Sequence, residues 1–305
     1  MVEPRLRVRS SGLGGSGYVI PAIDGEPHKG IKNTAGETIA AKIDNAGAVI
    51  VLPGVTTINK HAGNEALIQW TANQTAAAAV MNLDYLSRRS EEVGYGFLRF
   101  YYKRKPDLAD PVMMSYKRIL DDSSELGTNI HEYMEARVKN EFPPDLNSTQ
   151  AVEMAELVEG FLFENTVESL ATELTVFGDG YAGTLDGIWV INGRSYLLDV
   201  KTARMIHESH MRQLAALDRC DYAFVEEDGQ WKRVDIPEYD GYAFLHIRPT
   251  DIDDNGNMIP GFCRLEVVDE GELEYHYRAF RGLLEKATSD RELRKYKSRK
   301  EGKNE

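Results

Sequence analysis

The order of the expected helices and strands predicts a mixed α/β fold, in which helices flank a central mixed β-sheet. Helical patterns dominate residues 64–170, and a strand hairpin follows near residue 181. One helix, further strands and a last helix come after that hairpin. Helices and strands that follow one another in this way pack in layers, with the helices on the faces of the sheet.

The part of the chain before the sheet is expected to be a loose arm followed by helices. Residues 1–50 are rich in glycine and polar residues and show no clear period, so we expect a loose arm with a short strand or two. An alanine-rich segment predicts a helix over 64–86. Another helix is expected over 110–120.

Two further helices are indicated by residues that cap helix starts. The pair Ser123–Ser124 predicts the start of a helix that ends at Glu141, just before two prolines. Ser148 or Thr149 predicts the start of another helix, which runs to about Leu170.

Runs of apolar and β-branched residues predict the strands. Glu173–Phe177 alternates between apolar and polar residues. Tyr181–Ile191 and Arg194–Lys201 flank Asn192–Gly193, a dipeptide that is typical of a two-residue hairpin turn. We therefore expect these two runs to pair as antiparallel neighbours.

The rest of the sheet and its last helices follow the hairpin. A helix is expected at about 208–224. Gly241–Arg248 and Phe262–Val268 are expected to be strands, joined by a polar turn, and 270–287 is expected to be the last helix. Three regions result: an arm over 1–52, a main domain over 53–288 and a basic, flexible tail over 289–305.

The hairpin predicts a cluster of charged side chains. If Asn192–Gly193 is the turn, Asp186 and Asp199 lie directly opposite each other, with Cβ atoms roughly 5 Å apart. Side chains alternate along a strand, so Lys201 shares the face of Asp199. Two opposed carboxylates repel each other. A divalent cation between them would remove that repulsion.

Two acids and a lysine on one rigid face predict a site for phosphate chemistry. Hard oxygen ligands suit Mg²⁺ or Mn²⁺, which can polarise a phosphoryl oxygen and activate a water. A lysine can orient that water or stabilise developing negative charge. The alternative is an ordinary solvated face that happens to carry Asp186, Asp199 and Lys201, because an isolated Asp-x-Lys is common.

The same residues resemble the core motif of the PD-(D/E)XK nucleases, and within them the RecB-like and phage exonuclease type without an iron–sulfur cluster. The motif is carried by Gly183-Thr184-Leu185-Asp186-Gly187 and by Leu198-Asp199-Val200-Lys201-Thr202. An upstream histidine after a glycine (His131), an acid at the start of the first core strand (Glu173) and a downstream glutamine (Gln213) also match. The resemblance covers roughly residues 53–268 and implies a restriction-endonuclease-like core.

The resemblance implies a role for each of these residues. His131, Asp186 and Asp199 would ligate the metal, together with the backbone carbonyl of Val200. Glu173 would hold a metal or its water, Lys201 would serve the attacking water, and Gln213 would organise the site or contact DNA. For His131, Glu173 and Gln213 the alternatives are an ordinary helix histidine, a strand carboxylate and a solvent-facing amide.

One departure from the family concerns a tyrosine that often lies four residues after the glutamine. This chain has Leu217 there and Tyr222 further on, which leaves the role of Tyr222 in doubt. Another concerns cysteines. Cys220 and Cys263 are too few for a cluster with four cysteine ligands. They also make no disulfide framework, which favours a reducing, cytoplasmic setting. The resemblance to phage exonucleases, in a short chain without a helicase, implies that this is the cytoplasm of a bacterium or a phage-infected cell.

The charge distribution allows confined contact with nucleic acid. The net charge of −13 argues against passive DNA binding, but residues 88–118 and 291–303 are locally basic. Around residue 100, aromatic side chains are interleaved with cations, a composition suited to a groove for single-stranded DNA. The expected contacts there are Arg99, Tyr101, Lys103, Arg104 and Lys105. The alternative is that the aromatic side chains are core and the cations solvated.

The sequence therefore predicts a hydrolase, a divalent-metal-dependent deoxyribonuclease that acts as an exonuclease in recombination, repair or phage replication. An endonuclease on the same core and a non-catalytic protein that binds DNA ends are the alternatives. DNA is the expected partner, and a homo-oligomer or a single-strand annealing protein is a further one. No apolar run approaches the roughly 18 residues of a membrane span, so no membrane partner is expected.

Overall fold

The structure is a computed structural model of the 305-residue chain. It describes all residues except 1–4, 11–14, 64, 94–109, 254 and 302–305. The chain divides into two compact units, residues 1–62 together with 129–305, and residues 63–128. The domain boundaries expected at 52 and 288 stay predictions.

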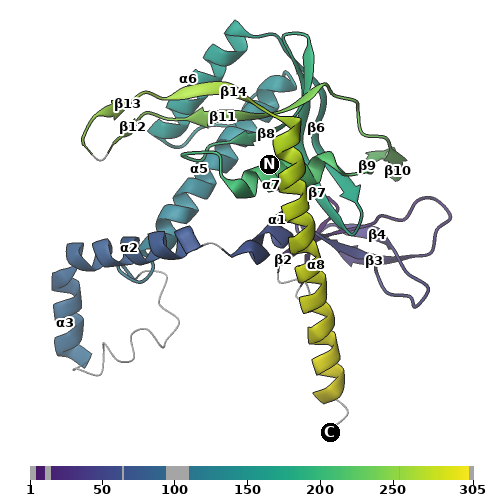
Figure 1. Cartoon of the computed structure of the whole chain (residues 1–305), viewed down its shortest axis with the longest axis horizontal. Helices are drawn as coiled ribbons and strands as arrows, with labels where there is room; N and C mark the ends of the chain where they lie inside the picture. Colours follow the sequence, from purple (N-terminus) through teal and green to yellow (C-terminus); the bar gives the residue numbers. More distant parts are fainter. Residues whose placement is uncertain (1–4, 11–14, 64, 94–109, 254, 302–305) are drawn as a thin grey trace. The chain divides into compact units, whose positions relative to one another are not determined.

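A seven-stranded mixed sheet forms the centre of the larger unit, which confirms the predicted fold class (Figure 1). The strand order is β10-β9-β6-β7-β8-β11-β14. Strands β8 and β11 are parallel, and the other neighbouring pairs are antiparallel. The strands are β6 (Val167–Gly178), β7 (Tyr181–Ile191), β8 (Arg194–Lys201), β9 (Tyr222–Glu227), β10 (Gln230–Val234), β11 (Gly241–Arg248) and β14 (Phe262–Val268).

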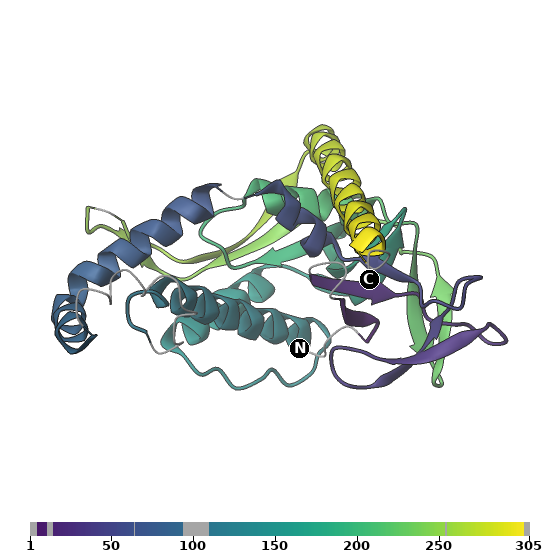
Figure 2. The same cartoon turned by 90° about the horizontal axis from the view of Figure 1, so that it is seen from below.

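Helices cover both faces of this sheet (Figure 2). Helices α1 (Val55–Asn59), α7 (Glu208–Asp218) and the first half of α8 (Glu270–Glu301) lie on one face. Helix α6 (Thr149–Glu164) and the end of α5 (Ser115–Val138) lie on the other. Buried side chains between the sheet and the first group include Leu185, Ile188, Leu214, Phe244 and Phe280. The two layers hold the sheet rigid from both sides.

The N-terminal residues form strands where a loose arm was expected. Strands β1 (Arg7–Ser10), β2 (Gly15–Val19) and β5 (Val51–Pro53) make a three-stranded sheet, and β3 (His28–Lys32) pairs with β4 (Thr38–Lys42). Their buried residues share a core with the main sheet, and this core includes Leu6, Val19, Ile39, Phe177 and Ala182. The apolar contacts explain why this polar, glycine-rich segment is ordered.

Several helix ends differ from the prediction. The two helices expected over 110–141 are one helix, α5, and Ser123 lies inside it with its hydroxyl donating to Ile119 O at 2.7 Å instead of capping. The single helix expected over 64–86 is two, α2 (Glu65–Met81) and α3 (Leu83–Val93). Between them the Asn82 amide donates to Ala78 O at 2.8 Å.

Other boundaries follow from the neighbouring strands. Ser148 caps α6 as predicted, accepting from Ala151 N at 3.1 Å, but α6 ends at Glu164 because β6 begins soon after. Helix α7 likewise ends before β9. The short 3₁₀ turn η2 (Lys60–Ala62) follows α1, and β12 (Asp251–Ile252) pairs with β13 (Met258–Ile259) in the predicted polar turn.

Helix α8 continues to Glu301 where the sequence predicted a flexible tail from residue 289. Its first half is anchored by buried side chains such as Phe280 and Leu284. Beyond Leu284 its residues are largely exposed. Within the described part of the chain, no helix is both long and apolar enough to cross a membrane.

Candidate functional site

The β7–β8 hairpin has the predicted turn and register. Asn192 and Gly193 have φ values of 52° and 82°, the left-handed conformation that this kind of turn requires at both positions. Gly187 pairs with Leu198, as the register demands. The two predicted aspartates come next, directly beyond these last paired residues.

Asp186 and Asp199 lie at the next position of this register, where the sequence predicted that they oppose each other, but the paired ladder stops one residue before them. Asp186 Oδ2 accepts a hydrogen bond from the backbone N–H of Val200 at 2.7 Å. Directly opposed like charges are unfavourable in a ladder. The backbone bond therefore gives Asp186 a donor while leaving it beside Asp199.

Asp199 is fully buried, so the reading of the three charged residues as a solvated surface set is wrong. Burial raises the pKa of Asp199 to about 6, an effect that Lys201 opposes and Asp186 reinforces. Burial also raises the pKa of Asp186. Adjacent buried acids with raised pKa values are costly to maintain, and they occur preferentially at functional sites.

Lys201 forms an ion pair with Asp199 Oδ2. Its side chain is largely buried, and burial lowers its pKa, but Asp199 and Asp186 more than compensate and leave the pKa raised. Lys201 therefore remains a charged ammonium group. In that form it can orient a water or stabilise negative charge, but it cannot act as a base.

Gln213 reaches the same carboxylate from helix α7. Its side-chain amide donates to Asp199 Oδ1 at 3.2 Å. The alternative interpretation, in which Gln213 faces solvent, is therefore wrong. One oxygen of Asp199 is held by Gln213 and the other contacts Lys201, so the carboxylate is fixed in orientation.

His131 lies on the other side of the site, on helix α5. Its Nδ1 is 3.5 Å from Asp186 Oδ2. Burial and the charge of Lys201 lower the pKa of His131 to about 4, against the opposite effects of Asp199 and a hydrogen bond to the Val200 backbone. His131 is thus neutral near pH 7, which is the state in which a histidine ligates a metal.

Glu173 lies within strand β6, which begins at Val167 and not at Glu173 as predicted, and it has an unusual backbone conformation. Its φ is +53°, although its neighbours Thr172 and Leu174 keep regular pairs with β7. Its place in that register is opposite Asp186. Burial, together with the charges of Asp186 and Glu135, raises the pKa of Glu173 to about 8. A left-handed, non-glycine residue in a strand is strained, and strain of this kind is common at functional sites.

The strain at Glu173 predicts a difference between two substitutions. Glu173→Ala removes the carboxylate but keeps the left-handed strain, whereas Glu173→Gly removes both. The left-handed conformation costs a non-glycine residue about 1–2 kcal/mol, partly offset by the greater freedom of glycine in the unfolded chain. We expect Glu173→Gly to be more stable than Glu173→Ala by about 1 kcal/mol in chemical denaturation. Equal stability of the two variants would contradict the strain.

The raised pKa of Glu173 also predicts how stability depends on pH without metal. The folded protein holds a proton on Glu173 from its ordinary pKa of 4.5 up to about 8, while the unfolded chain has lost it. The free energy of unfolding therefore falls as pH rises through this window. Denaturation in EDTA at several pH values should show the fall, and Glu173→Gln should reduce its slope. An unchanged slope in the variant would contradict the assignment.

Sequence reasoning missed one acid near the site. Glu135 lies one turn after His131 on α5, and its charge raises the pKa values of Glu173 and Asp186. Glu135 also pairs with Lys139 at 2.6 Å. The sequence could have indicated it, because Glu135 comes four residues after His131 on an expected helix and such residues share a helix face.

The residues predicted to contact nucleic acid lie outside the described residues. They are Arg99, Tyr101, Lys103, Arg104 and Lys105.

Leu217 and Tyr222, the two residues compared above with the tyrosine expected after Gln213, both pack against other side chains. Leu217 is buried in the core beneath the sheet, and Tyr222 stacks on Phe177 with their ring centroids 5.6 Å apart. Arg233 lies over the Tyr222 ring at 3.8 Å from its centroid. Both residues therefore have packing roles.

The donor groups fit Mg²⁺ bound together with a phosphate. Among the described residues, no three His, Cys, Asp or Glu side chains are already arranged as a metal cluster. Mg²⁺ does not need one, because it is usually held by one or two carboxylates together with water and substrate phosphates. Asp186 and Asp199 supply two such carboxylates. Asp199 Oδ2 is moreover a buried oxygen without a hydrogen-bond donor among the described residues, apart from its ion-pair contact with Lys201.

The fold and the site define a mixed α/β protein with a buried cluster of two aspartates and a lysine. The cluster lies at the end of the β7–β8 hairpin that is away from its turn. Neither a protein-family model nor a curated protein matches the sequence. Among solved structures, the chain is similar to one described as LHK-Exo in complex with dAMP. The similarity has 14% sequence identity and a TM-score of 0.28, and it covers 57% of this chain and 85% of that one. A score this low carries no argument about the site.

Proposed function

We propose that this protein is a divalent-metal-dependent deoxyribonuclease, and that it acts as an exonuclease. The observation that carries the proposal is the state of Asp199. This fully buried carboxylate is held by Gln213 at one oxygen and by Lys201 at the other, with Asp186 beside it. A fold that only needed stability would gain more from apolar residues at these positions.

Each residue of the cluster has a role in phosphodiester hydrolysis. Asp186 and Asp199 would hold Mg²⁺ or Mn²⁺, with His131, Glu173 and the Val200 carbonyl as further donors. The cation supplies charge stabilisation at the phosphate oxygens. Lys201, as an ammonium group, orients the attacking water and stabilises negative charge that develops in the transition state. Gln213 fixes the orientation of Asp199.

Linear and circular DNA substrates distinguish an exonuclease from an endonuclease, because an exonuclease needs a free end. End-labelled linear duplex, linear single strands and closed circular DNA are incubated with Mg²⁺, Mn²⁺ or EDTA. Loss of linear DNA alone, dependent on metal, supports the exonuclease. Cutting of the circle supports the endonuclease. If folded protein cuts none of them, the enzymatic proposal fails and the alternative of a non-catalytic protein that binds DNA ends remains.

The exposed end of α8 is a surface suited to the DNA backbone. It carries six cations and one acid over residues 291–300, in a chain of net charge −13. Among the described residues, none of these cations forms an ion pair. They are Arg291, Arg294, Lys295, Lys297, Arg299 and Lys300. Unpaired cations along one helix complement the phosphates of DNA.

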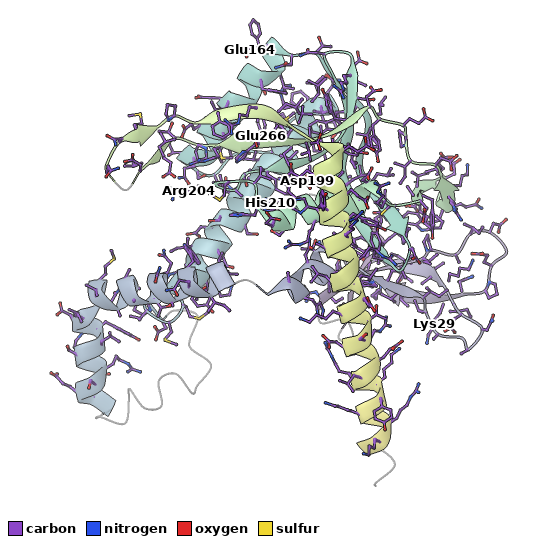
Figure 3. All side chains as sticks on the ribbon, viewed as in Figure 1. Lys29, Glu164, Asp199, Arg204, His210 and Glu266 are labelled. Carbon is purple, nitrogen blue, oxygen red and sulfur yellow. The ribbon has the colours of Figure 1, made fainter. Side chains whose placement is uncertain are left out.

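This surface predicts a change in the salt dependence of DNA binding. For duplex DNA, each lost phosphate contact should reduce the slope of log K against log salt by about 0.9. The double variant Arg294→Gln/Lys295→Gln should therefore show a shallower slope. The matched control is Lys29→Gln/Lys32→Gln on β3, which removes the same charge from an exposed hairpin elsewhere (Figure 3). Equal slopes for the two variants would contradict the prediction.

A further inference from the structure

His210 lies one turn before Gln213 on helix α7, on the same side of the helix. The chain leaves β8 at Lys201 and returns along α7. Gln213 reaches Asp199, which is two residues before the end of β8. His210, one turn closer to the start of α7, lies toward the Lys201 end of β8, and the charge of Lys201 contributes to lowering its pKa. Figure 3 shows His210 on α7 and Asp199 on the sheet. The helix thus presents two polar side chains along the β8 face of the site.

The hydrogen bonds of His210 fix which ring nitrogen carries its proton. The backbone N–H of His207 donates to His210 Nδ1 at 3.2 Å. Nδ1 is therefore the unprotonated nitrogen of a neutral ring, and Nε2 carries the hydrogen. Burial and the charge of Lys201 lower the pKa of His210 to about 3, which agrees with a neutral ring.

The Nε2–H group is a donor without an acceptor. Among the described residues, Nε2 of His210 has no hydrogen-bond partner, and the side chain is only partly buried. The neighbouring histidine is different. His246 is engaged at both ring nitrogens, with Ala203 O at 2.7 Å and Glu266 Oε1 at 2.8 Å. His210 alone of this pair can therefore bind a ligand.

We propose that His210 Nε2–H donates a hydrogen bond to a phosphate oxygen of the DNA substrate, next to the ammonium group of Lys201. This inference rests on the proposed nuclease function. A cation and a fixed neutral donor side by side match a phosphate, which presents several acceptor oxygens. The neutral ring with protonated Nε2 and occupied Nδ1 is unsuited to metal ligation. His210 would therefore position the phosphate and take no part in holding the metal.

Three substitutions separate phosphate binding from the hydrogen bond that His210 accepts at the start of α7. His210→Glu keeps an acceptor for the His207 N–H, as glutamate does at this position of a capping box, but has no donor. His210→Ala has neither group. His210→Gln has both. If His210 only stabilises the helix start, His210→Ala loses thermal stability without a change in cleavage, and His210→Gln behaves as wild type.

The test is single-turnover cleavage of end-labelled DNA in Mg²⁺, with melting temperature and oligonucleotide affinity measured in EDTA. A hydrogen bond to a charged group contributes about 1.5–3 kcal/mol, so we expect His210→Ala and His210→Glu to be about 10- to 150-fold slower. His210→Gln should recover most of the rate. If His210→Ala cleaves at the wild-type rate, the inference is overturned and the proposed function stands.

The affinity measurement keeps the two proposals separate. If wild-type protein cleaves nothing, the proposed function fails. Weaker oligonucleotide binding by His210→Ala than by His210→Gln would then still support the phosphate contact. Equal binding by both variants would overturn that contact as well.

Discussion

Replacing Lys201 with methionine is expected to slow DNA cleavage by about 10²–10³-fold, the usual effect of removing one charge-stabilising donor. Lys201 is the ammonium group that contacts Asp199 Oδ2, and its pKa is raised by the two neighbouring aspartates against the effect of burial. Its loss removes positive charge where the phosphate reacts. The rate is measured under single-turnover conditions, with DNA affinity measured separately and expected to change much less.

Stability must be followed in the same experiment. Removing one partner of a buried ion pair leaves the other charge uncompensated, at a cost of about 3–5 kcal/mol. Lys201→Arg keeps the positive charge and provides a folded companion, and it should still be slow because a planar guanidinium does not replace a compact ammonium group. Lys232→Met is the matched control, since Lys232 is exposed and paired with Glu227. Wild-type rates in both Lys201 variants would contradict the assigned role.

Mg²⁺ is expected to raise the melting temperature of the wild-type protein and to leave that of Asp186→Asn unchanged. Binding at a hundredfold excess over Kd stabilises a protein by about 2.7 kcal/mol. Asparagine can still accept the hydrogen bond from Val200 N, so the variant keeps the local structure while losing the charge. In EDTA, Asp186→Asn should be at least as stable as wild type, because a repulsive buried charge has been removed.

The matched control for this shift is Asp240→Asn. Asp240 also accepts a backbone hydrogen bond, from Ser195 N at 2.9 Å, but it is not part of the cluster. Its variant should keep the full response to Mg²⁺. The same shift in Asp186→Asn and wild type would show that the cation binds elsewhere.

Much of the sheet could be predicted because local signals agree with the fold. The bounds of β7, β8, β11 and β14 are those expected from sequence. The Asn192–Gly193 turn sets the register, which in turn places Asp186 near Asp199. Helix limits were less predictable. Ser123 resembles a cap but bonds back to Ile119 within α5, since a serine hydroxyl can serve either purpose.

The details of the site depend on contacts distant in sequence. The hydrogen bond from Val200 N to Asp186 Oδ2 joins the two strands just beyond their paired residues, and no local pattern indicates it. The left-handed backbone of Glu173 is likewise invisible in a sequence that reads as a regular strand. The sequence did not indicate a role for His210, because that role depends on Lys201, which lies on the neighbouring strand β8.

The most direct test of the central claim is the release of labelled nucleotides from linear duplex DNA by wild-type protein and by Asp186→Asn, each in Mg²⁺ and in EDTA. The buried aspartate pair should make release depend on both the cation and Asp186. We predict release by the wild type in Mg²⁺ and none in the other three conditions. Equal release by Asp186→Asn in Mg²⁺, or no release by folded wild-type protein, would contradict the account.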